Sequence, residues 1–177
     1  MPNWCYNRMN IDSTTEGGKI LAEAFRPKYK SWCEYQKTDV LHANPMRDLY
    51  PFPKELDITA SLGTKDDELS LTYAHNKEKF GYAHWYDWCI ANWGTKWDAN
   101  VEQFDDEDPK AVYVYFETAW SPPTAFLEWF CQQHPDTIFD CDYDEEGCFF
   151  EGETSHHPDT GFKDRSWQPA EEEELEE

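Results

Sequence analysis

Residues 111–134, AVYVYFETAWSPPTAFLEWFCQQH, decide the fold class of this chain. The side chains of the first ten residues alternate well enough in character to predict a central β-strand. Ser121-Pro122-Pro123 then begins a helix, because proline suits the first helical turn. The apolar face of that helix consists of Phe126, Leu127, Phe130 and Cys131. The stretch therefore predicts a strand that runs directly into an amphipathic helix.

The segments around this stretch add three further strands. Residues 94–104, GTKWDANVEQF, lead into one strand, and the acidic turn DDEDP at 105–109 joins it to the central one. Downstream, TIFDCDYDE at 137–145 and CFFEGE at 148–153 flank a turn at Glu146-Gly147 and predict a hairpin. The second part of the chain therefore has the order β-β-α-β-β.

The N-terminal part supplies another strand and two helices. Residues 4–11 are predicted to form a strand, and caps at 12–15 precede a helix that Pro27 interrupts. A second helix follows Gly81 and ends at Gly94, a residue typical of helix C-termini. Its predicted apolar face consists of Tyr82, Trp85, Tyr86, Cys89 and Trp93.

This order predicts an α+β fold of the ferredoxin-like type, an antiparallel sheet with helices on one face. We expect one domain over residues 1–153, with an inserted helical segment at about 28–80. From residue 154 the chain has few apolar residues and ends in a glutamate run. Residues 154–177 are therefore predicted to be an acidic, mobile C-terminal tail.

Negative charge is concentrated in the second part of the chain. The whole chain has 15 Lys and Arg against 37 Asp and Glu, a net charge of −22. Residues 1–101 have a net charge of −2, and residues 102–177 one of −20. Such a chain is not expected to bind nucleic acid directly or to bind an anionic membrane. Two interpretations stay open, a surface for solubility and an acidic face for a basic partner.

The cysteines and the N-terminus favour a cytoplasmic protein. None of the six cysteines forms a CxxC pair, so no zinc site is indicated. The first residues, MPNWCYNRMN, lack the apolar run of a signal peptide. No apolar run approaches the length of about 20 residues that spans a bilayer. Free thiols in a reducing compartment, several of them buried, are the expectation.

No motif predicts a catalytic residue, a metal or a cofactor. Phosphate loops, nucleophile elbows and HExxH are missing. His84 is a possible general base, but a half-exposed helix residue is the simpler interpretation. His156-His157 with Asp159 is a weak metal candidate, because adjacent side chains in a tail rarely hold a fixed geometry. Asp140, Asp142 and Asp144 have calcium-loop spacing, but Glu145 replaces the required glycine.

The segment WGTKWD at 93–98 places Lys96 between two indole rings in a region with few cations. One interpretation is a helix cap followed by a core turn. The other is a platform for a nucleotide or another anionic ligand, since aromatic faces and one cation suit such a molecule. The residues of that second interpretation are Trp93, Lys96, Trp97 and Trp120.

Five stretches resemble one known family. They are MPNWCYN at 1–7, PFPKEL at 51–56, GYAHWYDWCIANWGTKWDA at 81–99, ETAWSPP at 117–123 and YDEEGCFFEGE at 143–153. In these stretches the chain resembles the YubB-like, Api-type proteins of phages and conjugative plasmids. Phe52 and Lys54 depart from the expected pattern, as does the acidic tail. The resemblance implies a ferredoxin-like domain and a mobile-element context, and it implies no activity.

Three functions follow as hypotheses. The first is a non-enzymatic accessory protein that binds a host or defence protein with a basic surface, through an acidic surface that mimics nucleic acid. Its predicted partner-binding residues are Asp105, Asp106, Glu107, Asp108, Asp140, Asp142, Asp144, Glu145 and Glu146. The second is a small-ligand or nucleotide-binding module at the WGTKW cluster, with or without enzymatic activity. The third is an assembly protein that acts through oligomer contacts.

Overall fold

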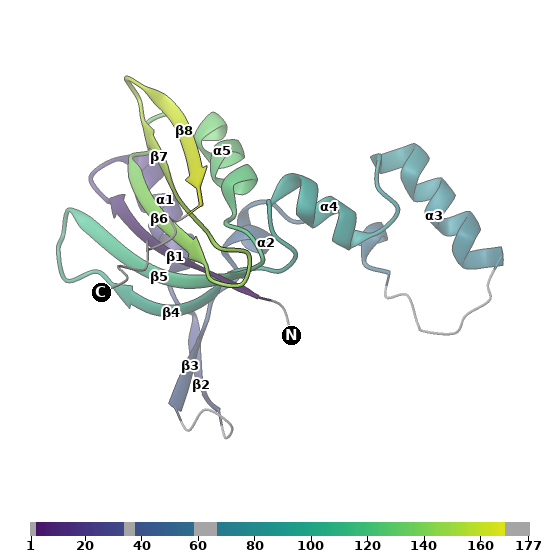
Figure 1. Ribbon diagram of the computed structural model, residues 1–177, viewed down its shortest axis with the longest axis horizontal. Helices are drawn as coiled ribbons and strands as arrows, with labels where there is room; N and C mark the ends of the chain where they lie inside the picture. Colours follow the sequence, from purple (N-terminus) through teal and green to yellow (C-terminus); the bar gives the residue numbers. More distant parts are fainter. Residues whose placement is uncertain (1–2, 34–37, 59–66, 169–177) are drawn as a thin grey trace, which may run out of the picture.

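The computed structural model describes residues 3–33, 38–58 and 67–168. Eight strands, five α-helices and one 3-10 turn follow one another along these residues, and Figure 1 shows their arrangement. The elements are β1 (Trp4–Asp12), α1 (Glu16–Phe25), β2 (Tyr29–Cys33), β3 (Thr38–His42), α2 (Pro45–Leu49), the 3-10 turn η1 (Lys54–Leu56), α3 (Asp67–Phe80), α4 (Trp85–Asn92), β4 (Asn100–Asp105), β5 (Ala111–Ala119), α5 (Thr124–Gln133), β6 (Phe139–Glu145), β7 (Phe150–His157) and β8 (Gly161–Trp167).

Six of the strands form one antiparallel sheet in the order β4-β5-β1-β6-β7-β8. Within it, the unit β1-α1-β4-β5-α5-β6 has the strand order of a ferredoxin-like fold, with its first strand between the third and the fourth. The hairpin strands β7 and β8 widen that unit on the β6 side. The predicted ferredoxin-like α+β fold is confirmed.

The insertion lies in the connection between α1 and β4. It contains the separate hairpin β2–β3, the short helix α2, and the helices α3 and α4. In Figure 1, α3 and α4 extend sideways from the sheet as an arm, and the β2–β3 hairpin projects away from the sheet. The sequence predicted an inserted helical segment here, at about 28–80, but it predicted neither the β2–β3 hairpin nor the bounds of α3.

The predicted start of the tail at residue 154 is wrong. Strand β7 continues to His157, and β8 pairs with β7 from Gly161 to Trp167. Residues 154–167 therefore belong to the sheet, because their backbone groups complete the β7–β8 ladder. The last part of the predicted tail, residues 169–177, lies outside the described residues.

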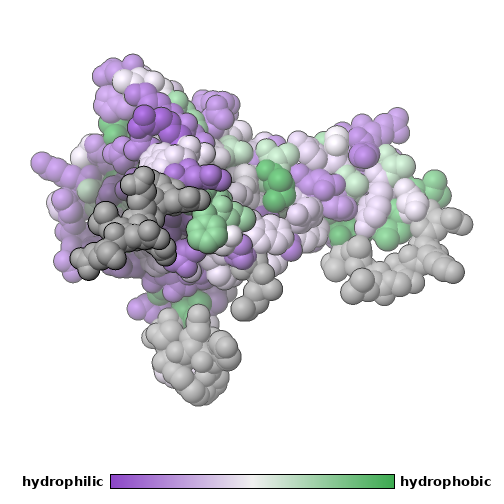
Figure 2. All heavy atoms as spheres, in the orientation of Figure 1, coloured by the Kyte–Doolittle hydropathy of each residue, from purple (hydrophilic) through white to green (hydrophobic). Residues whose placement is uncertain are grey.

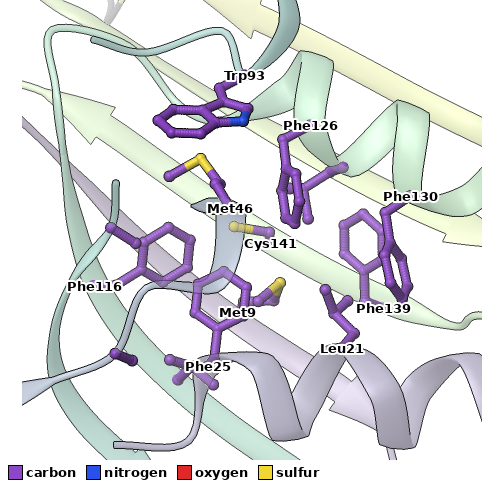
Figure 3. Packing of buried hydrophobic residues seen from close by; sticks show 14 of the residues in the cluster. Met9, Leu21, Phe25, Met46, Trp93, Phe116, Phe126, Phe130, Phe139 and Cys141 are labelled. Carbon is purple, nitrogen blue, oxygen red and sulfur yellow. The ribbon is translucent and has the colours of Figure 1, made fainter. Parts of the chain in front are cut away.

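The core lies between one face of the sheet and the helices α1 and α5. Alternate residues of β1 and β5 point into it, and α1 is capped by Thr15, whose hydroxyl accepts the Gly18 N–H. Figure 3 shows how tightly aromatic rings fill this space. The labelled residues are Met9, Leu21, Phe25, Met46, Trp93, Phe116, Phe126, Phe130, Phe139 and Cys141, all buried.

The aromatic helix is shorter than predicted, and four residues of its predicted apolar face lie in or against the core together with Trp88, whereas Tyr86 does not. Helix α4 covers Trp85–Asn92, so Tyr82 precedes it, and its buried residues are Trp88 and Cys89. Gly94 has a φ of +85°, which confirms the predicted glycine turn at the helix end. This turn leads the chain from the arm back to the sheet.

Candidate functional site

The sheet face opposite α1 and α5, called the open face below, presents three rows of half-buried or exposed side chains. The strand registers place one residue from each of the six strands in every row. In the order β4, β5, β1, β6, β7, β8, the rows are Asp105, Tyr113, Asn10, Asp140, Ser155, Lys163; then Gln103, Tyr115, Arg8, Asp142, Glu153, Arg165; and then Asn100, Glu117, Tyr6, Asp144, Glu151, Trp167.

Carboxylates predominate over cations in these rows. The predicted residues Asp140, Asp142 and Asp144 lie together on β6, one in each row. The register adds four acids from other strands and three cations. The four acids are Asp105, Glu117, Glu151 and Glu153, and the cations are Arg8, Lys163 and Arg165. Hydrophilic side chains also cover most of the visible sheet body in Figure 2.

Tyrosine rings occupy the middle of the open face. The rings of Tyr6 and Tyr115, from the adjacent strands β1 and β5, stack with centroids 6.5 Å apart at 17°. Partial burial, and then the negative charge of Glu117, raise the pKa of both phenols. Burial also raises the pKa of Glu117 itself. The phenols therefore stay protonated at neutral pH and can donate hydrogen bonds.

Ion pairs hold the cations of the open face in place. The Arg8 guanidinium donates to Asp144 at 2.6 Å, and this bond raises the pKa of Arg8. On β8, Arg165 Nε donates to Glu153 at 3.0 Å, and the Trp167 indole donates to Glu151 at 3.0 Å. These contacts fix side chains in extended positions above the sheet without neutralising all of its acids.

A hollow of about 710 Å³ opens along β6, β7 and β8. From the open face it is lined by Asp140, Asp142, Glu153, Ser155, Lys163 and Arg165, and also by Cys141, Thr154, Phe162 and Asp164. Its open-face carboxylates come from β6 and β7, whereas β8 supplies both cations and the carboxylate of Asp164. A side chain with a cationic end group fits the β6 side of this hollow.

A second hollow, of about 600 Å³, lies at the β6–β7 turn. It is lined by Asp144, Glu145, Glu146, Phe149, Phe150 and Glu151. Phe149 is 71% exposed and has a φ of +53°, which a bulky residue rarely adopts. Glu145, predicted to contact a partner, is instead 1% exposed and accepts the backbone N–H groups of Gly147 and Cys148. Its carboxylate therefore holds the turn.

The predicted cluster at residues 105–108 forms the β4–β5 turn, and only Asp105 is part of the open face. Asp105 also accepts the Glu107 N–H, and Asp108 accepts the Lys110 N–H at 2.8 Å. Asp106 pairs with Arg26 at 2.8 Å, at the end of α1. Two of these acids thus stabilise the turn, and a third anchors α1.

The predicted platform around Lys96 is rearranged. Trp93 is 1% exposed and its indole donates to the Tyr50 carbonyl at 2.8 Å, so Trp93 belongs to the core. The Lys96 ammonium lies 4.4 Å from the Trp97 ring centroid and 5.2 Å from that of Trp120. Tyr86 is the third ring, at 5.6 Å. Lys96, Trp97 and Trp120 are therefore brought together, with Tyr86 in place of Trp93.

The histidines and cysteines do not converge. His156 is buried and its Nδ1 lies within hydrogen-bond distance of the Thr137 carbonyl, whereas His157 is exposed beside Asp159. No group of three or more His, Cys, Asp or Glu could hold a metal ion within the part of the chain that the structure describes. The buried thiols Cys5, Cys89 and Cys131 each have a pKa raised to about 12 by burial.

Comparison with known proteins supports the fold of the C-terminal half. Residues 92–177 match the family model of the ferredoxin-like domain in Api92-like protein. The crystal structure of protein Api92 from Yersinia pseudotuberculosis matches 97% of this chain and 100% of that chain, with 10% sequence identity and a TM-score of 0.49. No curated protein matches the chain. No helix of the described ranges is long and apolar enough to cross a membrane.

The residues that match this family model include strands β4 to β8 of the open face, while β1 lies outside the matched residues. The sequence alone identified the β6 acids but missed Arg8, Glu117, Glu151 and Glu153. Period-2 alternation in β1 and β5 is the signal that could have found the Arg8 and Glu117 side chains. The register between β6 and β7 was needed for the other two.

Proposed function

We propose that this chain is a non-enzymatic binding protein whose open face holds a basic surface of a partner protein. The observation behind this proposal is the set of seven carboxylates in three rows, with only three cations among them. Aromatic residues on an open sheet can also stack nucleic-acid bases, but these carboxylates would repel the phosphates. A protein surface rich in Arg and Lys can form ion pairs with the carboxylates and cation–π contacts with the rings.

The spacing of the acids narrows the class of partner. Alternate residues along β6 are separated by about 6.8 Å, and adjacent strands by about 4.8 Å. The result is a regular two-dimensional array of negative charge. Basic surfaces that bind nucleic-acid phosphates present Lys and Arg in repeated positions and so fit such an array. The proposed partner is therefore a nucleic-acid-handling protein of a host or of its defence system, and the chain an accessory protein of a phage or plasmid.

Two charge-matched triple variants test the proposal. The open-face variant is Asp140→Asn/Asp142→Asn/Asp144→Asn, and the control is Asp57→Asn/Glu78→Gln/Glu128→Gln, whose three exposed acids lie on other elements. Each tagged protein captures partners from a bacterial lysate at about 50 and 300 mM salt, and mass spectrometry quantifies them. Exposed charge pairs contribute about 0.5 kcal/mol each, so the open-face variant should bind about tenfold less of a basic partner.

The control variant should bind as the wild type does, and the higher salt concentration should weaken binding by both. If the open-face variant and the wild type captured equal amounts of partner, the open face would not be the binding site. Equal loss in the two triple variants would show that net charge alone attracts the partner.

A further inference from the structure

A third hollow, of about 300 Å³, lies between α2, α4 and the WGTKWD turn, and Asn100 is the one open-face residue among those that line it. Segments far apart in the sequence converge on it, from the end of β3 to the start of β4. They supply Leu41, His42, Ala43, Asn44, Arg47, Phe52, Trp85, Cys89, Trp93, Lys96, Trp97, Asp98, Ala99 and Asn100. Small-molecule sites combine apolar and aromatic walls with converging polar groups, and both kinds of residue line this hollow in similar share.

Aromatic rings form its walls. Phe52 and Trp93 lie with centroids 6.0 Å apart, and the bond from the Trp93 indole to the Tyr50 carbonyl fixes this ring in the core. Trp85 is half-buried, and Trp97 is 39% exposed. Two rings are thus partly open to solvent beside a fixed one, so a planar molecule can enter and stack.

Two cations border the same hollow. The Arg47 guanidinium lies 5.3 Å from the Phe52 ring centroid, and the Lys96 ammonium lies 4.4 Å from that of Trp97. Each cation therefore lies over an aromatic ring, and the planar guanidinium can still donate paired hydrogen bonds to an anion.

The acid in the hollow is already engaged. The Asp98 carboxylate accepts the backbone N–H groups of Met46, Arg47 and Ala99 at 3.1, 2.9 and 2.9 Å. These bonds attach the first turn of α2 to the WGTKWD turn and so shape the hollow. The Arg47 side chain forms no close ion pair with Asp98 among the described residues, although its positive charge opposes the rise that burial causes in the pKa of that carboxyl.

We propose that this hollow binds a small planar aromatic molecule with one anionic group, the ring stacking on Trp85 and Trp97 and the anion bonding to Arg47. The volume is at the lower end for small-molecule sites, which limits the ligand to about one ring system and its charged group. An aromatic carboxylate and a nucleoside monophosphate share this chemistry. Two cations at one hollow in a chain of net charge −22 make it a local exception in the protein's field.

The test uses adenosine monophosphate and indole-3-acetate as separate probes, each titrated to about 5 mM. Calorimetry gives the affinity, and the indole N–H signals of Trp85 and Trp97 in a ¹⁵N–¹H spectrum give the location. At least one probe should shift these signals. Arg47→Gln should weaken its binding at least tenfold, and Arg26→Gln, an equal charge change on α1, should alter it less than twofold.

The probe that binds more tightly identifies the preferred anionic group as phosphate or carboxylate. Equal affinities would mean that an aromatic ring and a negative charge are enough for binding. If neither probe shifts the two indoles, or if Arg47→Gln and Arg26→Gln weaken binding equally, the proposal is wrong. Lys96→Gln serves as a second variant should Arg47→Gln lose the wild-type spectrum. None of these outcomes depends on the open face.

Discussion

Replacing Gly152 by alanine should destabilise the protein, although a β-strand is ordinarily more stable with alanine than with glycine. Gly152 lies on β7 opposite Tyr143 of β6, and the Tyr143 ring lies over it. A Cβ at this position would lie 2.5 Å from Cζ of Tyr143, and closer still to its hydroxyl and to the Arg165 carbonyl. Ordinary contacts are at least 3.4 Å. The ring or β8 must therefore move.

That movement breaks a hydrogen-bonded group that holds β8 to the sheet. The Tyr143 hydroxyl donates to Asp164 at 2.9 Å, and the Thr154 hydroxyl donates to the same carboxylate at 2.7 Å. Overpacking costs about 1–3 kcal/mol, and loss of a hydrogen bond to a charged group costs about 1.5–3 kcal/mol. The gain from removing a glycine is about 0.5–1 kcal/mol. The free energy of unfolding should therefore fall by about 2–5 kcal/mol, and Tm by roughly 10 °C.

Urea unfolding followed by circular dichroism measures this change. Ser155→Ala, on the same strand but on the open face, is the matched control and should change stability by less than about 0.5 kcal/mol. In a Tyr143→Ala protein, Gly152→Ala should lower the free energy of unfolding by less than it does in the wild type, because the obstructing ring is gone. A Gly152→Ala protein as stable as wild type would refute the steric reasoning.

Three further predictions concern charge and the core. Burial raises the pKa of Asp98 from 3.8 to about 6, so the folded state keeps this proton to higher pH than the unfolded state does. Wild-type stability should therefore fall by about 2–3 kcal/mol relative to Asp98→Asn as pH rises from about 4 to 6, and parallel urea-unfolding curves would contradict this. Added salt should raise the wild-type Tm between about 20 and 200 mM, because it screens repulsion among the acids, and Asp140→Asn/Asp142→Asn/Asp144→Asn should reduce that rise in a calorimetric scan. Trp93→Phe should cost about 2–3 kcal/mol in urea unfolding, because the Tyr50 carbonyl loses its donor, whereas the partly exposed Trp97→Phe should cost less than about 0.5 kcal/mol.

The parts of the fold that the sequence predicted are those whose pattern is local. The strand and helix at 111–134 bury one face each, so their hydrophobic periodicity can be recognised in the amino-acid sequence. Strand β8 is an edge strand with exposed charges at Lys163, Asp164 and Arg165, so it has no apolar alternation and looked like a tail. Helix α3 lacks a buried apolar stripe, and Leu71 is 71% exposed. Such a helix has no amphipathic signature.

The candidate site was predictable only along single strands. The alternating acids of β6 pointed to one face, because strand geometry alone dictates it. Which strands lie beside β6 depends on pairings between distant segments, so Arg8 and Glu117 could not be joined to the site from spacing. The prediction for Glu145 was wrong for another reason, because its burial follows from the backbone geometry of the β6–β7 turn. Trp93 was predicted both for the apolar helix face and for the ligand platform, and its burial supports the first of these interpretations.

The position of β1 has a consequence for the growing chain on the ribosome. Both neighbours of β1, strands β5 and β6, begin more than a hundred residues after it starts, at Ala111 and Phe139. At a synthesis rate of 5–20 residues per second, its backbone groups and apolar side chains wait on the order of 10 s for a partner. During that interval the emerging N-terminal half has a strand without a sheet. The sheet around β1 is therefore completed only after the acidic strand β6 has been made.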